Sequence, residues 1–480
     1  MMEMMLTPRR QNRSGVDILN QKKFHMPTAY TILFLLLILV AAATWIIPAG
    51  SYDYVDGVPV AGTYHTVEQN PQGVGDVLKA AFSGFYDAVD VCIFILMVGG
   101  FLGVVMKTGA VDAGVGNVIR LLGGREKWLI PILMLLFGLG GTTYGMWEET
   151  MAFYPLLIPV FLAAGYDAVV GISVILLGAG AGVIASTVNP FATGIAAGFA
   201  GVSLGEGIVL RLLEWVAFEA AAIWFVMAYA AKVKKNPSKS VVGVGAGKIQ
   251  VSMDQQVPFT AKRKVIMALF TLTFLIMVYA VVPFDEMGLS LPALGWWFPE
   301  LSALFLVAGV VIGLIDRMSE EELVDTYVAG CADLLGVAFI IGISRGITVL
   351  MNDGAITDTV LHWGEQALSG AGAISFTLLV FALYLPLTIL IPSSSGLATL
   401  SIPIVAPLGK FAGVGGDLVV TAFQSASGLV NIITPTAAVV MGALALGHVP
   451  YDRWVKYVWK LILWFLLLAL AFLVAGVLLG

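Results

Sequence analysis

The sequence predicts an all-α polytopic membrane protein, built as an inverted-topology repeat with two re-entrant hairpins and two broken transmembrane helices. Three observations predict this fold class. The chain is 59% hydrophobic and 12% charged, whereas a soluble domain carries roughly a quarter charged residues. Its apolar runs are about 20 residues long, which is the length of a spanning helix. The order of these runs in the first half also recurs in the second half.

The first half begins with a polar, basic segment, residues 1–26, which we expect to be a cytoplasmic tail. The first repeat is predicted to occupy residues 27–232. Its expected parts are a spanning helix (27–48), an outer loop (49–78), a crossing helix (87–106), an amphipathic surface segment (107–127), a hairpin (128–164), a broken helix (168–200) and a closing helix (208–231).

The hairpin and the broken helix are both predicted from interrupted apolar runs. Residues 128–164 are too long for one crossing and too short for two, and a Gly-rich polar stretch interrupts them near Gly141–Glu149. Residues 168–200 are interrupted at Ser186–Pro190. Proline removes a backbone donor and clashes with the preceding turn, and the hydroxyl and amide groups beside it can bind the freed backbone or a ligand.

The second half follows a linker, residues 233–260, that we expect in the cytoplasm. The second repeat is predicted at 261–480. Its expected parts are three spanning helices (265–282, 298–315 and 327–350), an amphipathic segment (353–369), a hairpin (373–410) broken at Ile391–Thr399, a broken helix (418–446) interrupted at Asn431–Thr436, and a last helix (454–479).

The number of crossings between the two hairpins predicts that the hairpins enter from opposite faces of the membrane. Five apolar segments separate them, which is an odd number. Charge placement predicts a cytoplasmic N-terminus independently. In this topology, 21 of the 25 lysines and arginines fall on the cytoplasmic side, and the exceptions are Lys79, Arg211, Arg345 and Lys410. This agrees with the positive-inside rule.

The adjacent acids Glu148 and Glu149 distinguish the first hairpin from the second, which has Gly396 and Leu397 at the matching positions. Carboxylates at membrane depth are costly and usually face a cavity or a partner. One acid could bind a cationic group or carry a proton. Alternatively, the pair could cap backbone N–H groups or bind Arg345. Adjacent helical residues point about 100° apart, so we expect different roles for the two.

Other polar residues in apolar runs leave alternatives open. Arg345 could bind a substrate carboxylate or pair with an acid on another helix. Trp147 and Tyr144 could stack on a cation or pack structurally. For Asp90, Glu214, Glu219 and Asp333, contacts between helices or helix-end positions are the favoured interpretation.

The sequence indicates no metal site, no cofactor and no nucleic-acid partner. Cys92 and Cys331 are far apart, and the four histidines are scattered without ligand spacing. No nucleophile–base pair accompanies Ser393–Ser395, and no phosphate-binding Gly-Lys loop is present. An enzyme or an ATP-driven pump is therefore disfavoured.

Inverted repeats with broken helices are typical of secondary transporters that bind substrate at the midplane. Half-helix N-termini offer N–H groups and half-helix C-termini offer carbonyls. Four interruptions that meet in one volume could therefore hold both charges of a small solute, and the serines and threonines at them add neutral hydrogen bonds.

Four motifs carry a family resemblance over nearly the whole chain after residue 27: GTTYGMWEETMAFYPLLIP, ASTVNPFATGIAAG, IPSSSGLATLSIPI and NIITPTAAVVMGAL. The sequence resembles the YfcC-type branch of the four-carbon-dicarboxylate anaerobic carrier family, which is similar to arginine/ornithine antiporters and belongs to the ion transporter superfamily. The resemblance implies a homodimer in which each subunit has a scaffold part and a transport part that moves as an elevator.

By that resemblance, substrate lies between the two hairpin tips and the two broken-helix joints. The substrate-binding residues that this implies are Tyr144, Gly145, Trp147, Glu148, Glu149 and Thr150 in the first hairpin; Ser186, Thr187 and Asn189 in the first broken helix; Ser393, Ser394, Ser395 and Gly396 in the second hairpin; and Asn431, Thr434 and Thr436 in the second broken helix.

These features predict a secondary transporter of a small amino-acid-like solute, basic ones included, in the cytoplasmic membrane. Exchange and coupling to a proton or sodium ion both fit the sequence. A dicarboxylate carrier is the main alternative, and a channel or an intramembrane enzyme fits less well. The two acids at one tip favour a cationic group on the substrate.

Overall fold

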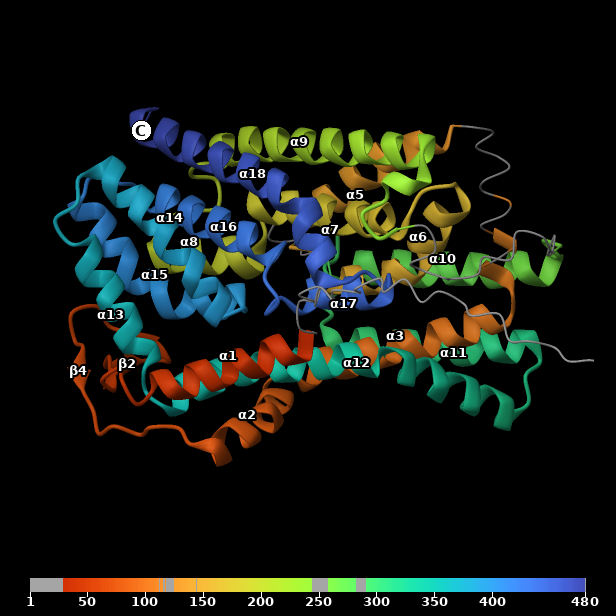
Figure 1. The fold of residues 1–480 in the computed structure, drawn as a ribbon, viewed down its shortest axis with the longest axis horizontal. Helices are drawn as coiled ribbons and strands as arrows, with labels where there is room; N and C mark the ends of the chain where they lie inside the picture. Colours follow the sequence, from red (N-terminus) through yellow and green to blue (C-terminus); the bar gives the residue numbers. More distant parts are fainter. Residues whose placement is uncertain are drawn as a thin grey trace, which may run out of the picture.

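The computed structural model describes residues 29–111, 113–114, 117, 125–143, 145–243, 258–281 and 291–479. Within these ranges the chain is mostly helical, and many helices run along the long axis of the molecule (Figure 1). Five of the described helices are long and apolar enough to cross a membrane: α3, α11, α12, α14 and α18. The prediction of a helical polytopic membrane protein is therefore confirmed.

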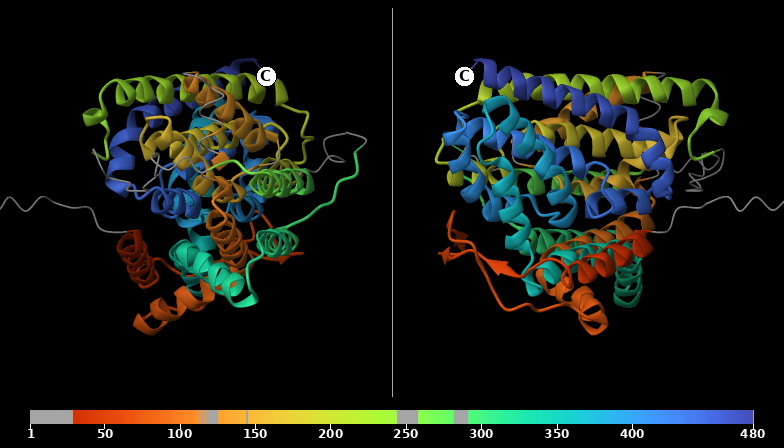
Figure 2. Two further views of the ribbon diagram at one scale, coloured as in Figure 1. Left: turned by 90° about the vertical axis from the view of Figure 1, so that its right-hand side faces the viewer. Right: turned by 60° about the vertical axis from the view of Figure 1, so that its left-hand side comes forward.

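The helices form two layers that are visible in Figure 1 and in both views of Figure 2. We call the first the lower layer. It comprises α1 (Ala29–Ala43), α2 (Val74–Asp87), α3 (Val89–Lys107), α10 (Ala261–Val281), α11 (Phe298–Asp316) and α12 (Glu320–Asp353). Aromatic rings join α10 to this layer, because Phe270 stacks on Phe101 at 5.6 Å and Phe274 meets Phe305 at 5.6 Å.

The upper layer contains the remaining long helices. It comprises α5 (Leu129–Thr143), η2 (Glu148–Phe153), α6 (Tyr154–Ala163), α7 (Ala168–Ile184), η3 (Pro190–Gly194), α8 (Ile195–Ala200), α9 (Ile208–Lys235), α14 (Ala373–Leu390), α15 (Ser394–Phe411), α16 (Gly416–Asn431), α17 (Ala438–Leu446) and α18 (Tyr451–Leu479). Two short turns, η1 (Glu126–Trp128) and η4 (Pro237–Lys239), lie beside it, and α13 (Thr357–Leu368) connects α12 to α14.

Glycines allow close backbone contact within each layer. In the lower layer, a Cβ on Gly99 of α3 would lie 2.5 Å from the Gly330 carbonyl of α12. In the upper layer, a Cβ on Gly182 of α7 would lie 2.2 Å from the Gly138 carbonyl of α5. Small residues are the usual means by which membrane helices approach each other, because lipid provides no hydrophobic driving force between them.

The segment expected as an outer loop, residues 49–78, contains more structure than the sequence indicated. Strand β1 (Gly50–Ser51) pairs antiparallel with β4 (His65–Thr66), and β2 (Tyr54–Val55) pairs with β3 (Val58–Pro59). Helix α2 then begins at Val74, within the expected loop. It is amphipathic and too short to span, which is why a search for long apolar runs missed it.

Two tyrosines tie this outer segment to α13. The Tyr52 hydroxyl donates to Glu365 at 2.7 Å, and the Tyr54 hydroxyl donates to Asp358 at 2.8 Å. Burial, reinforced by these carboxylates, raises the pKa of both phenols above the usual value. Both hydroxyls therefore stay protonated and remain donors across the physiological pH range.

The first helix is shorter than the sequence indicated. A spanning helix was expected over 27–48, but α1 ends at Ala43, and the Thr44 hydroxyl donates back to the Ala41 carbonyl at 2.6 Å. Such local side-chain hydrogen bonds compete with helix continuation. The predicted tail, about half of the surface segment 107–127 and part of the linker lie outside the described residues.

We predict that Gly330→Ala lowers the thermal unfolding temperature in detergent. Its new Cβ would lie 2.3 Å from the Gly99 carbonyl, and overpacking of this kind costs about 1–3 kcal/mol. Gly198→Ala on α8 is the control, since a Cβ there meets nothing within 4 Å. Equal unfolding temperatures for the two variants would contradict the proposed close packing of α3 and α12.

Candidate functional site

Two pairs of helices reverse direction inside the upper layer. Helix α5 ends at Thr143, and helical structure resumes with η2 at Glu148 and continues into α6. Helix α14 ends at Leu390, and α15 begins at Ser394, where the Ser393 hydroxyl accepts from the Gly396 N–H at 3.2 Å. In Figure 1, α5 and α6 lie towards one end of the molecule and α14 and α15 towards the other.

Two further helices of this layer are interrupted. Helix α7 ends at Ile184, and the chain resumes as the π-helical turn η3 and then α8. Helix α16 ends at Asn431, and α17 begins at Ala438. These breaks coincide with the polar segments Ser186–Pro190 and Asn431–Thr436.

Hydrogen bonds join the end of α5 to the break after α7. The Thr142 hydroxyl donates to the Ala185 carbonyl at 2.8 Å, and the Thr187 hydroxyl donates to the Thr142 carbonyl at 2.9 Å. The Thr187 N–H also donates to the Thr142 carbonyl at 2.9 Å. Backbone groups of Thr142, Ala185 and Thr187 at this junction are therefore paired within the protein, as the membrane interior requires.

The four interruptions surround one cavity of about 300 Å³. Both layers contribute to it. The upper layer provides Gly145, Trp147, Glu148, Glu149, Val183, Asn189, Pro392, Ser393, Ser394, Ser395, Asn431, Thr436, Ala437, Ala438 and Val439. The lower layer provides Asp87, Ala88, Asp90, Val91, Trp297, Phe298, Ile341, Ser344 and Arg345.

The lining of this cavity is strongly acidic. Four carboxylic side chains line the cavity (Asp87, Asp90, Glu148 and Glu149), and Arg345 is the basic residue among the described lining residues. Arg345 Nε lies 3.3 Å from Asp87 Oδ2. The arginine thus pairs with an acid on another helix, one of the two alternatives that the sequence left open.

Glu148 and Glu149 differ in their local roles. Glu149 is 6% exposed, and its Oε2 accepts from the Trp147 N–H at 3.1 Å, so it caps the backbone of the tip. Glu148 is only half-buried. Of the two acids, Glu148 is therefore the one more open to a ligand.

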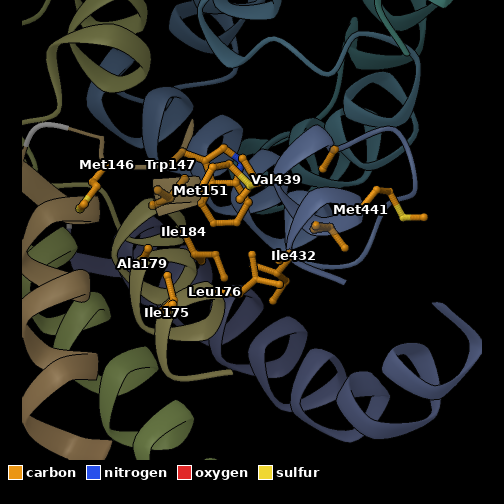
Figure 3. Packing of buried hydrophobic residues seen from close by; sticks show 14 of the residues in the cluster. Met146, Trp147, Met151, Ile175, Leu176, Ala179, Ile184, Ile432, Val439 and Met441 are labelled. Atoms are coloured by element: carbon orange, nitrogen blue, oxygen red, sulfur yellow. The ribbon is translucent and has the colours of Figure 1, made fainter. Parts of the chain in front are cut away.

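Trp147 packs at the edge of the same cavity. It is 9% exposed, and it lies beside Met151 and Val439 in Figure 3. The Thr150 hydroxyl donates to the Trp147 carbonyl at 2.5 Å. The indole thus takes part in the buried apolar cluster and also lines the cavity, so packing and ligand contact are compatible at this position.

Several predicted site residues have partners within the protein and do not line the cavity. Their hydroxyl or backbone groups bind one another or a neighbouring carbonyl: Thr150 with Trp147, Ser186 with Thr193, Thr187 with Thr142, Gly396 with Ser393, and Thr434 with Thr436. They shape the tips and joints around the cavity. Tyr144 lies outside the described residues.

The lower-layer residues of the lining were not predicted as site residues. Asp87 and Asp90 flank the junction of α2 and α3, and Ser344 lies on α12, where its hydroxyl donates to the Thr436 carbonyl at 2.5 Å. The sequence marks Asp90 only as an acid beside an apolar run. Asp90 is far from the interruptions along the chain, so its place in the same cavity could not be predicted from the sequence.

Two helix N-termini also face the cavity. Ser393, Ser394 and Ser395 at the start of α15 line it, as do Ala437 and Ala438 at the start of α17. Such ends carry a partial positive charge and free N–H groups, which attract carboxylates. No group of three or more His, Cys, Asp and Glu side chains within the described ranges could hold a metal ion.

Long apolar helices around a polar cavity that both layers line define a polytopic membrane transporter. The sequence comparisons then give the family. The C4-dicarboxylate anaerobic carrier family matches residues 26–478. The chain belongs to this family, whose members are carriers rather than enzymes.

Two curated relatives match almost end to end. An uncharacterized protein of Haemophilus influenzae is 35% identical over 95% of this chain and 98% of its own length. The putative basic amino acid antiporter YfcC of Escherichia coli is 30% identical over 91% of this chain and 93% of its own length. The expected family resemblance is therefore confirmed.

Two solved structures are also similar over most of the chain. The YdaH transporter of Alcanivorax borkumensis aligns with 92% of this chain and 98% of its own, with 15% identity and a TM-score of 0.42. MtrF of Neisseria gonorrhoeae, described among antimetabolite efflux pumps, aligns with 93% of this chain and 94% of its own, with 17% identity and a TM-score of 0.43.

We predict that Thr142→Val destabilises the protein by about 1–3 kcal/mol, because it leaves buried partners at the α7 break unsatisfied. Valine keeps the branched shape of threonine. Thr143→Val is the matched control, since among the described residues the Thr143 hydroxyl bonds to the Leu139 carbonyl of its own helix and to no other segment. Unfolding temperature in detergent is the measurement, and a larger drop for the control would contradict the assignment.

Proposed function

We propose that this chain is a secondary active transporter that exchanges small amino acids with basic side chains across the cytoplasmic membrane. The acidic cavity between the layers is the observation that carries the proposal. Its four carboxylic side chains outnumber the single arginine of the described lining, and Arg345 is already paired with Asp87. Removing a cation from water is costly unless opposite charges in the site compensate for the lost hydration.

The cavity also suits the carboxylate that every amino acid carries. The N-termini of α15 and α17 offer backbone N–H groups and serine hydroxyls on one side. The carboxylate of the substrate binds there, while its amino and side-chain cations bind towards Glu148 and Asp90. A cavity of about 300 Å³ lies at the lower end of the range found for small-molecule sites.

The relatives support the same substrate class. The Escherichia coli relative bears the description of a putative basic amino acid antiporter, and it matches this chain over nearly its full length. Exchange also fits an acidic cavity, because a site that binds a cation strongly is emptied more easily when another cation replaces it.

The arrangement of the layers supports an elevator mechanism. All four interruptions belong to the upper layer, and the cavity lies where that layer meets the lower one. We propose that the upper layer is the transport part and the lower layer the scaffold. The opposite positions of α5–α6 and α14–α15 (Figure 1) support an inverted-topology repeat. A cytoplasmic N-terminus and a homodimeric assembly complete the proposal.

A dicarboxylate carrier is the second candidate, and two observations favour it. The family is described as one of C4-dicarboxylate carriers, and Arg345 with two helix N-termini could hold two carboxylates. Such a substrate would have to lie beside Glu148 and Asp90, which repel it. That repulsion is the reason to prefer a cationic substrate.

We expect purified protein in proteoliposomes loaded with unlabelled L-arginine to take up labelled L-arginine or L-lysine by counterflow. Succinate-loaded vesicles should take up no labelled succinate. Succinate counterflow without amino-acid counterflow would replace the first candidate by the second. Unitary conductance in planar bilayers would identify a channel instead.

We predict that Glu148→Gln reduces L-arginine counterflow at least tenfold, because removing one charged partner of a desolvated pair costs about 2–5 kcal/mol. The unfolding temperature should change little, since Glu148 is only half-buried. Glu321→Gln is the matched control, an exposed acid at the start of α12 and outside the cavity lining. Equal counterflow by Glu148→Gln and wild type would exclude Glu148 from the substrate site.

A further inference from the structure

Two charged side chains are fully buried in the upper layer outside the cavity lining. Glu214 and Arg211 lie three residues apart on α9 and are 0% and 1% exposed. Residues at this spacing share one face of a helix. Buried ionisable residues inside membrane helices are costly and are functional candidates by default.

The Glu214 carboxyl is only partly satisfied. Its Oε1 accepts from the Ser425 hydroxyl of α16 at 2.8 Å, whereas its Oε2 has no hydrogen-bond partner among the described residues. No ion pair within 4.0 Å joins it to the described basic residues. A carboxylate in this position is strongly penalised, so the neutral acid, with its proton on Oε2, is favoured.

Arg211 is positioned to stabilise the charged form. Its Nη2 donates to the carbonyls of Leu204 at 2.6 Å and Glu206 at 3.0 Å, while its Nε has no partner within the described ranges. The guanidinium is therefore held close to Glu214 without pairing with it. A carboxyl that burial keeps neutral, beside a cation that favours its ionisation, is able to change its protonation state.

Helix α16 reaches from Glu214 to the cavity and carries buried polar side chains along this length. Ser425 binds Glu214, and Gln424 beside it shares a second face of the helix with Ser427 and Asn431, at positions i, i+3 and i+7. Each of these side chains is at most 5% exposed. Gln424 Oε1, Ser427 Oγ and Asn431 Oδ1 all lack hydrogen-bond partners in the described structure. Asn431 lines the cavity, and it lies six positions after Ser425, about 9 Å along the axis.

We propose that Glu214 binds the coupling proton of this transporter and exchanges it with the cavity by way of the buried polar side chains of α16. The inference rests on the proposed secondary transport and adds the ion that drives it. On uptake, an O–H bond forms at Oε2 with a proton from water in the cavity. On release, that bond breaks, the proton returns to water, and Ser425 and Arg211 stabilise the carboxylate left behind.

The other charged groups near Glu214 are few. On and just before α9 these are Arg211, Glu206 and Glu219, and Asp417 lies at the start of α16. Helices α5 and α7 contain no titratable side chain. On α18, the stretch opposite Glu214 follows Lys460 and is uncharged, as the contact between Phe218 and Phe465 at 4.7 Å indicates.

Glu219 provides a matched comparison on the same helix. It is 2% exposed, and neither of its carboxyl oxygens has a hydrogen-bond partner within the described residues. Its carboxyl lies against Gly138 of α5, where a Cβ would meet its Oε2 at 2.4 Å. With no donor or cation bound to it, Glu219 is expected to remain neutral throughout the transport cycle and to exchange no proton.

The test uses proteoliposomes with the membrane potential clamped and a gradient of one pH unit in either direction. Wild type should accumulate labelled L-arginine up to about tenfold under one of the two gradients, since one pH unit is equivalent to a tenfold concentration ratio. Glu214→Gln should keep arginine counterflow and lose this accumulation. Glu219→Gln should accumulate arginine as wild type does.

The outcomes separate this inference from the proposed function. Absence of arginine counterflow in wild type would overturn the proposed substrate. Counterflow without gradient-driven accumulation in wild type would overturn proton coupling alone. Accumulation that survives in Glu214→Gln, or that is lost equally in Glu219→Gln, would overturn the assignment to Glu214.

Two further measurements cover a failure of Glu214→Gln to fold. Ser425→Ala removes the donor that favours the carboxylate, so the pH at which gradient-driven arginine uptake is half-maximal should move upward. The second measurement needs no substrate. The infrared carbonyl band of a protonated carboxyl group should be present in wild type at neutral pH and lose intensity in alkaline buffer. A band that does not change with pH would overturn the proposal.

Discussion

The backbone of an interrupted helix must find its hydrogen bonds inside the protein, and this constraint governs the upper layer. Lipid offers no partners, so the breaks bind polar groups from other segments of the chain. Thr142 at the end of α5 binds the segment after α7, and the Thr436 carbonyl in the break after α16 receives the Ser344 hydroxyl of α12. The breaks therefore converge, and polar groups from distant parts of the chain come together where the two layers meet.

The acidic side chains of the cavity come from both layers and have different roles. Glu149 caps the backbone of its own tip, while Glu148 is half-buried and lines the cavity together with Asp90 from the lower layer. Two adjacent acids thus serve different purposes: one keeps an irregular segment folded, and the other adds to the acidic field of the cavity. Because the cavity is lined from both layers, a displacement of one layer against the other would change its charge as well as its shape.

Much of the fold was predictable because interruptions leave clear marks in an apolar sequence. Prolines and hydroxyl side chains at Ser186–Pro190 and Asn431–Thr436 indicated the breaks, and the long helices followed from run lengths. The cavity residues that come from the lower layer could not be predicted, because Asp87 and Ser344 look like ordinary helix residues in the sequence. Only tertiary packing places them beside the hairpin tips. Helix α2 was also missed, since its amphipathic pattern carries no long apolar run.

The outer segment with its two strand pairs has a mechanical consequence. It clamps α13 through Tyr52 and Tyr54, and α13 is the covalent link between α12 and the pair α14–α15. Short joints flank this helix at either end. Ala355 already adopts a left-handed φ of 50° at one joint, and Gly370 has a φ of 76° at the other. The slide of the upper layer proposed above would therefore tilt α13 as a rigid helix about these two joints, and the length of α13 would limit the distance moved.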